Sequence, residues 1–167
     1  MILGMSLATL TLVHVIISLI GIVSGILVMF GLLGSSRMPG MTAIFLLTTI
    51  LTNATGFLFP FEKLLPSHII AILSLVLLAI ACLALYGMKL SGAWRSIYVV
   101  TAMTSLYLNV FVLVIQGFLK VPFLHALAPS VPPSEPPFAV IQGIVLLFFV
   151  LVIIGAVRRF RPPATFA

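Results

Sequence analysis

The sequence predicts an all-α integral membrane protein: a bundle of five transmembrane helices with the N-terminus outside and the C-terminus in the cytoplasm. Composition is the first reason. Of 167 residues, 63% are hydrophobic and 6% are charged, whereas soluble domains carry about 25% charged residues. The second reason is that the apolar residues form five runs, each long enough to cross about 30 Å of hydrocarbon. The distribution of basic residues then predicts the orientation.

The five runs form a single transmembrane domain, and glycine or proline separates most of them. The predicted spans are residues 7-33, 42-59, 68-88, 94-119 and 138-157. Pro66 and Pro137 precede the third and fifth spans, where a missing backbone N–H costs little. No basic residue precedes the first run, which is also longer than the core of a typical secretory signal. We therefore expect it to remain in the mature protein.

The fourth span carries a polar stripe. At about 100° per residue its polar side chains share one helix face, and they are Tyr98, Thr101, Ser105, Asn109, Gln116 and Lys120. Such a face must turn towards protein or water, because hydrocarbon offers its polar groups no hydrogen-bond partner. The Pro-rich outer loop that follows, residues 121-137, is expected to lack regular helix.

Orientation follows from the basic residues between the spans. Five spans place the termini on opposite sides. One side receives six basic residues, which are Arg37, Lys89, Arg95, Arg158, Arg159 and Arg161. The other side receives Lys63 and Lys120, together with both acids, Glu62 and Glu135. Because basic loops stay in the cytoplasm, this asymmetry places the C-terminus inside.

With this orientation, polar side chains gather in the outer half of the bundle, where they predict a ligand-binding site. Its residues are His14, Asn53, Asn109, Gln116, Lys120 and Gln142. A mostly apolar pocket with a few convergent polar groups is typical of small-ligand sites, and residues 121-137 are expected to cover it. Lys120 would attract an anionic or carbonyl group at the mouth, while His14 could change charge near neutral pH. A structural alternative stays open, in which the amides only bond neighbouring helices.

Two glycines on the first span predict close helix packing. Gly21 and Gly25 form a small-xxx-small pattern, which in membranes marks close contact between helices, within the chain or between copies.

The sequence gives little support for a disulfide, a metal site, a catalytic site or a nucleic-acid-binding surface. Cys82 is the one cysteine, which excludes an internal disulfide, a CxxC pair and a thiolate zinc site. No metal site and no catalytic residue are predicted, although His14, His68 and His125 leave haem ligation as a weak alternative. The net charge of +6 is spread over loops and forms no basic groove, so nucleic acid is not an expected partner.

Four stretches in the second half of the chain carry a resemblance to known proteins. They are Trp94-Arg95-Ser-Ile-Tyr98, Leu106-Tyr-Leu-Asn109-Val-Phe111, Gln116-Gly-Phe-Leu-Lys120-Val-Pro122 and Glu135-Pro-Pro-Phe138. These resemble a group of small bacterial multi-pass membrane proteins with no assigned activity. The resemblance implies a bacterial inner membrane and carries over no reaction.

The expected function is therefore that of a small membrane-embedded binding or accessory protein rather than that of an enzyme. It would hold a lipid-like or quinone-like molecule, or a larger membrane complex, through its outer half. Two alternatives remain: a transporter or channel that uses the polar helix faces, and a haem-binding redox subunit. The expected partners are the lipid bilayer, a small apolar ligand, and further copies of the chain or a larger complex, with no cofactor assigned.

Overall fold

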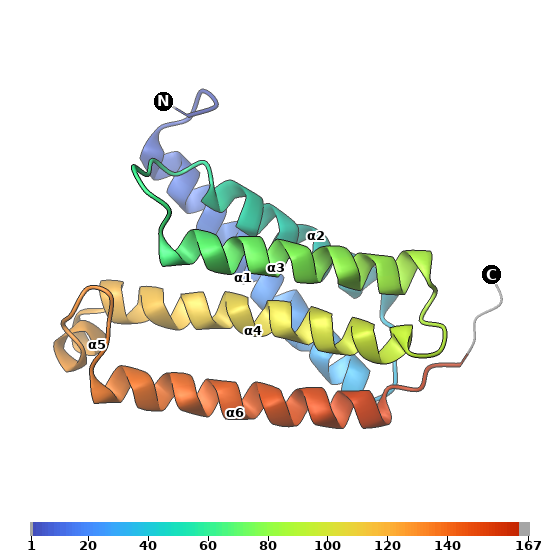
Figure 1. The fold of residues 1–167 in the computed structure, drawn as a ribbon. Helices are drawn as coiled ribbons and strands as arrows, with labels where there is room; N and C mark the ends of the chain where they lie inside the picture. Colours follow the sequence, from blue (N-terminus) through green and yellow to red (C-terminus); the bar gives the residue numbers. More distant parts are fainter. Residues whose placement is uncertain (1, 164–167) are drawn as a thin grey trace.

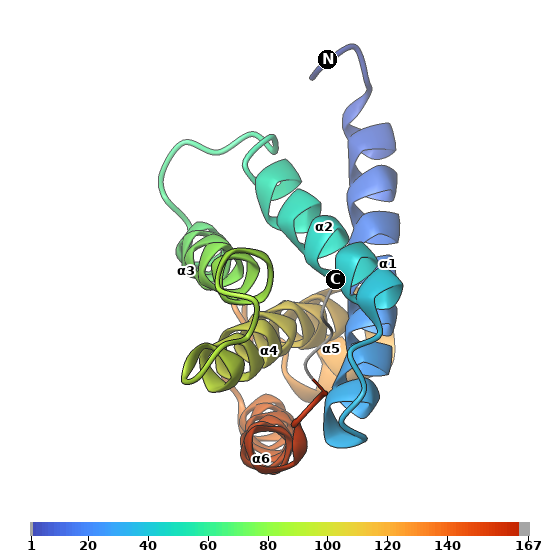
Figure 2. The same cartoon turned by 90° about the vertical axis from the view of Figure 1, so that its right-hand side faces the viewer.

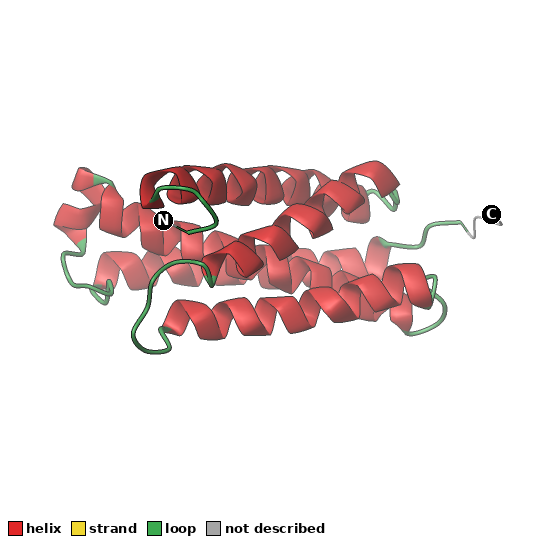
Figure 3. Ribbon diagram, turned by 90° about the horizontal axis from the view of Figure 1, so that it is seen from above, coloured by secondary structure: helices red, strands yellow, loops and turns green. Residues whose placement is uncertain are grey.

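The computed structural model describes residues 2–163, and these are almost entirely helical (Figure 3). The helices are α1 (Leu7–Leu33), α2 (Pro39–Gly56), α3 (Pro66–Cys82), the π-helix η1 (Leu83–Gly87), α4 (Trp94–Lys120), α5 (Pro122–Leu127) and α6 (Pro136–Arg159). Residues 2–163 contain no β-strand beyond an isolated bridge between Ile2 and Met5. The predicted all-helical class is thus confirmed.

Local sequence explains where the helices begin. The Ser6 hydroxyl accepts a hydrogen bond from the backbone N–H of Thr9 at 3.1 Å and caps α1, satisfying one of the donors that a helix start leaves free. Four further helices, α2, α3, α5 and α6, begin with proline in their first turn, where its fixed φ suits a helix and its missing N–H leaves no bond broken.

Four helices are long and apolar enough to cross a membrane, which indicates a membrane protein. They are α1, α3 together with η1, α4 and α6, with mean hydropathy between 2.0 and 3.0. Helix α2, in the region of the predicted span 42-59, is not among them. It has 18 residues, and its five threonines and Asn53 lower its mean hydropathy.

The long helices form a slanted two-part bundle (Figures 1 and 2). Helices α3, α4 and α6 lie side by side, while α1 and α2 pack against each other and cross that row at an angle. The residues that α1 buries lie mostly between Gly21 and Leu32. At its N-terminal end, α1 therefore diverges from α4 (Figure 1).

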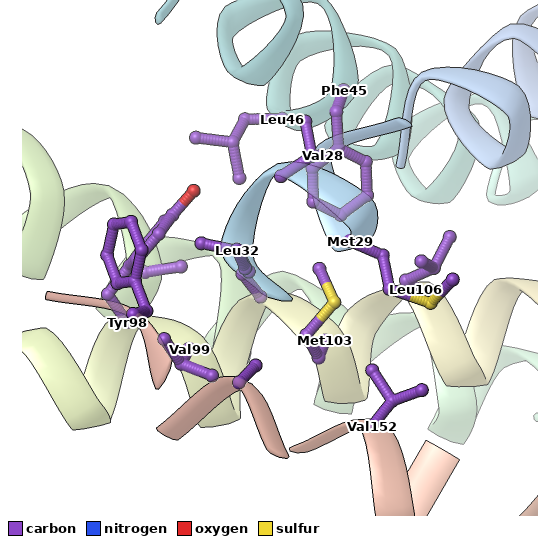
Figure 4. Close-up of a cluster of buried hydrophobic side chains, with 14 of the residues drawn as sticks. Val28, Met29, Leu32, Phe45, Leu46, Tyr98, Val99, Met103, Leu106 and Val152 are labelled. Atoms are coloured by element: carbon purple, nitrogen blue, oxygen red, sulfur yellow. The ribbon is translucent and has the colours of Figure 1, made fainter. Parts of the chain in front are cut away.

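Helix α4 lies at the centre of the hydrophobic core (Figure 4). Its fully buried Val99, Met103 and Leu106 face α1, α2 and α6. Close approach of the backbones depends on Gly25 of α1. A Cβ atom there would lie 2.6 Å from Leu106 Cδ1 and 2.9 Å from Phe45 Cδ1, so a larger residue would overlap both helices.

The segment after α4 differs from the prediction. Residues 121-137 were expected to lack regular helix, but Pro122–Leu127 forms the short helix α5. Proline is tolerated there because it occupies the first position of the helix. The π-helix η1 was not predicted either, because its wider turn continues the apolar run of α3 without a sequence break.

Candidate functional site

A cavity of about 540 Å³ lies where α1 and α4 diverge. Helix α1 lines it with Thr11, His14, Val15, Ser18, Leu19 and Ile22. Helix α4 lines it with Asn109, Val112, Leu113, Gln116, Gly117 and Lys120. Both sets follow the same spacing of three and four residues, so each helix presents one continuous face to the cavity. The end of α2, the following loop and the start of α3 complete the lining.

A side chamber of about 90 Å³ adjoins this cavity and shares His14, Thr52, Gly56, Ser67, Asn109 and Val112 with it. It reaches Asn53 of α2 and Ile70 and Ala71 of α3. Polar and apolar side chains both line the chamber, and its size suits a few water molecules.

His14 is held from one side by α2. Its Nδ1 lies 2.8 Å from Thr55 Oγ1, and its ring packs edge-to-face on Phe59 with centroids 5.3 Å apart. The position of the imidazole is thus fixed by a hydrogen bond and an aromatic contact, which suits a binding group more than a loose surface histidine.

Asn109 is the deepest amide of the cavity. Its Nδ2 atom is buried without a hydrogen-bond partner among the described residues, and it would lie 3.5 Å from a Cβ atom at Gly21. A buried amide donor without a partner is costly. Because this nitrogen has almost no accessible surface, it is other atoms of Asn109 that line the cavity.

Asn53 has structural partners instead. Its Nδ2 donates to the Thr49 carbonyl at 2.8 Å and to Ser74 Oγ at 3.2 Å. It therefore links α2 to α3 and contributes to the side chamber rather than to the main cavity.

Gln116 and Lys120 form the rim. Both side chains are exposed, and both line the main cavity one and two turns beyond Val112. Lys120 thus places a positive charge at the mouth, where it can meet an anionic or carbonyl group.

Gln142 does not join this group. Its Nε2 donates to the Phe111 carbonyl at 3.0 Å, and it lines neither cavity. Helix α6 packs on a different side of α4, so a residue at similar depth still lies away from the site.

The expected cover is also wrong. No residue between 121 and 137, all within the described chain, lines either cavity. Instead, Phe59, Pro60 and Leu65 of the α2–α3 loop line the mouth. Helix α5 packs back on α4, with Leu124 Cδ1 3.6 Å from a Cβ atom placed at Gly117.

The three histidines have different surroundings. His68 lines the main cavity beside His14, but its Nδ1 accepts the backbone N–H of Leu65 at 3.1 Å. His125 lies outside, with Nδ1 3.2 Å from the Phe118 carbonyl. Within residues 2–163 no group of three or more His, Cys, Asp or Glu side chains could hold a metal ion. A haem ligated by His14 and His68 fits poorly, because a His68 Nδ1 that accepts a hydrogen bond leaves the hydrogen on Nε2, the nitrogen that would bind the iron.

Sequence reasoning missed Thr11 and the apolar lining of the α2–α3 loop, whereas Ser18 is expected on the same helix face as His14. Thr11 stands three positions before His14, so helical spacing alone could have found it. The loop residues carry no comparable signal.

Comparison with known proteins finds no match to a protein-family model, to a curated protein or to a solved structure.

Proposed function

We propose that this chain is a five-span protein of a bacterial inner membrane that binds a small amphipathic molecule, lipid-like or quinone-like, between α1 and α4. One observation carries the proposal. The cavity is large enough for a small ligand, and its lining combines polar His14, Gln116 and Lys120 with apolar side chains of α1 and α4. The polar groups at its mouth match the head group of an amphipathic molecule, and the apolar side chains of its lining match the tail.

Helix α2 is proposed as the fifth span. It returns along α1 in the opposite direction (Figure 1), and Thr42, Thr49 and Thr52 are buried inside the bundle. Thr48 and Thr55 donate to the carbonyls of Ile44 and Leu51, which satisfies hydroxyls without water. The low mean hydropathy of α2 is thus compatible with a span that other helices shelter.

We also propose which end of the bundle faces the cytoplasm. The α1–α2 turn, the α3–α4 turn and the end of α6 share one end of the bundle (Figure 1), and these segments contain Arg37, Lys89, Arg158, Arg159 and Arg161, with Arg95 in the first turn of α4. We place that end in the cytoplasm and the cavity in the outer half.

Contacts in the inner half favour binding over transport. Ser105 Oγ donates to the Thr101 carbonyl and Thr101 Oγ1 to the Ile97 carbonyl. These hydroxyls are satisfied by their own helix, and fully buried Phe45, Leu78 and Met103 fill the space around them. The polar stripe of α4 therefore continues inwards as helix-satisfied hydroxyls in an apolar core, which offers no hydrated path.

Native mass spectrometry of the purified protein tests the proposal. We expect a co-purified amphiphile on the wild-type chain. Ser18→Phe should reduce its occupancy about tenfold by filling the cavity beside His14. Leu12→Phe is the matched control, because Leu12 lies on the same helix, is 61% exposed and does not line the cavity. The control should keep full occupancy.

The thermal midpoints of both variants should remain close to the wild-type value, since neither changes the buried core. A wild-type protein without any bound molecule, or equal occupancy in Ser18→Phe and Leu12→Phe, would contradict the proposal.

A further inference from the structure

Three exposed arginines lie at the C-terminal end of α6, and they are Arg158, Arg159 and Arg161. None of their side chains has a hydrogen bond or ion pair within residues 2–163. Basic residues at a helix end can bond its last carbonyls, but here Arg95 of α4 does so. Its guanidinium donates to the Val157 carbonyl at 3.2 Å and to the Phe160 carbonyl. The three arginines therefore remain available to a partner outside the chain.

The end of α6 is held in place by contacts with α4 and with the α1–α2 turn. The Phe160 side chain is 1% exposed and lies against Tyr98 of α4, with ring centroids 6.2 Å apart. The backbone N–H of Arg161 donates to Ser35 Oγ at 2.8 Å. Because these contacts fix the backbone, the arginines can bind a ligand without the cost of ordering the segment that carries them.

Arg158 lies at the end of the outward face of α6. The apolar side chains of Leu147, Leu151 and Ile154 are 60%, 61% and 44% exposed. Arg158 continues their spacing of three and four residues and so shares their helix face. Helix α6 has 24 residues, which give about 36 Å of helix to cross about 30 Å of hydrocarbon. A side chain in its last turn therefore reaches the level of lipid head groups, with its methylene stem along the apolar face.

This end of the bundle has no acid to compensate its charge. The two acids of the chain, Glu62 and Glu135, lie in loops at the opposite end (Figure 1). Guanidinium groups recognise phosphate oxygens through paired charge-assisted hydrogen bonds. A ligand that complements both the arginines and the apolar face beside them combines an anionic phosphate with an acyl chain.

We propose that the end of α6 binds an anionic phospholipid. Its phosphate contacts the three arginines, and one acyl chain lies along the apolar face that ends at Arg158. A zwitterionic phospholipid fits less well, because its ammonium group brings a further positive charge to the arginines. This site lies at the other end of the bundle from the cavity mouth, and it requires neither the cavity nor a particular orientation in the membrane.

Native mass spectrometry of the purified full chain tests the site. The protein is exchanged into detergent micelles that contain equal amounts of dioleoylphosphatidylglycerol, which is anionic, and dioleoylphosphatidylcholine, which is zwitterionic and has the same acyl chains. Retention of phosphatidylglycerol should exceed that of phosphatidylcholine at least about tenfold, because each basic group near an anionic head group contributes about fivefold.

Single variants separate the arginines from the general charge of this end. Arg158→Gln and Arg159→Gln remove a charge without breaking a contact within the described chain, so each should lower the preference about fivefold. Lys89→Gln is the matched control and should keep the full preference. Lys89 is exposed at the same end, but it lies in the α3–α4 turn, and α4 lies between α3 and α6 (Figures 1 and 2). The thermal midpoints of all three variants should stay close to that of the wild type.

Three outcomes would overturn the site. The first is equal retention of the two lipids by the wild type. The second is an equal loss of preference in Lys89→Gln and Arg158→Gln, which would reduce the arginines to general interfacial charge. The third is displacement of the lipid by excess soluble glycerophosphate, which would make free phosphate the ligand.

Ser18→Phe keeps this test separate from that of the proposed function. This variant fills the cavity between α1 and α4 and should leave the preference for phosphatidylglycerol unchanged. A loss of the preference in Ser18→Phe would place the anionic lipid in the cavity and overturn the site on α6.

Discussion

The pKa of Glu135, which lies outside the membrane segments, is lowered by hydrogen bonds in the folded protein. Glu135 precedes α6, and its carboxylate accepts hydrogen bonds from the Ser130 hydroxyl, from the Ser130 N–H at 3.0 Å and from the Ser134 N–H at 3.1 Å. These bonds, that of the Ser130 hydroxyl above all, lower the pKa of Glu135 from 4.5 to about 2. The ionised carboxylate thus holds the turn between α5 and α6 together.

The lowered pKa of Glu135 makes folding stability depend on pH. Because the folded-state pKa is lowered, the contribution of Glu135 to folding stability is complete above about 4.5 and is lost as the pH falls towards about 2. Glu135→Gln should lower the thermal midpoint at pH 7, and the difference from wild type should shrink between pH 4.5 and pH 2. Circular dichroism melts in detergent measure this. Glu62→Gln, at the other acid, is the control, and an equal loss there would contradict the prediction.

Cysteine labelling tests the depth order within the cavity. In a Cys82→Ala background, Gln116→Cys should react rapidly with a membrane-impermeant thiol reagent applied from outside, because Gln116 is exposed at the rim. Asn109→Cys should react more slowly. Val99→Cys, at a position that is 0% exposed, should stay unlabelled. No reaction at residue 116 would mean that the rim is closed or faces the cytoplasm.

At the scale of helices, the contact between α1, α2 and α4 depends on a missing side chain. Gly25→Leu would push a side chain into Leu106 and Phe45, and overpacking of this kind typically costs about 1–3 kcal/mol. Gly143→Leu is the matched control, because nothing lies within 4 Å of a Cβ atom at Gly143. Thermal unfolding in detergent should show a lower midpoint for Gly25→Leu alone. Equal midpoints for the two variants would place Gly25 outside the helix contact.

Helices were predictable because each apolar run is long and ends at proline, glycine or charge. The prolines around α5 predict a break in the helix, whereas Pro122 occupies the first helical position, where proline is favourable. The separation of Gln142 from the site depends on which side of α4 contacts α6. The true lining of the mouth depends on the slant of α1. Both are tertiary features without a pattern in the sequence, whereas the positions of Asn109, Gln116 and Lys120 on one face of α4 followed from helical spacing alone.

At the scale of the whole molecule, the end-to-end charge difference predicts the topology. A reporter fused to the C-terminus should be active only in a format that reports the cytoplasm, because six of the eight basic residues lie at that end. Fusions after Ser36 and after Lys63 should report opposite sides if α2 crosses the membrane. The same side for both would remove α2 from the spans, and a periplasm-active C-terminal fusion would reverse the orientation.

The slant of α1 against α4 also bears on the route by which the proposed ligand would reach the cavity. Val15, Leu19 and Leu113 line the cavity and are 38%, 44% and 42% exposed, so the opening is flanked by side chains that would meet acyl chains rather than water. A molecule that partitions into the bilayer would then reach the site by lateral diffusion within one leaflet. Its occupancy would follow its mole fraction among the lipids, so adding inert lipid at a constant total amount of ligand would empty the site.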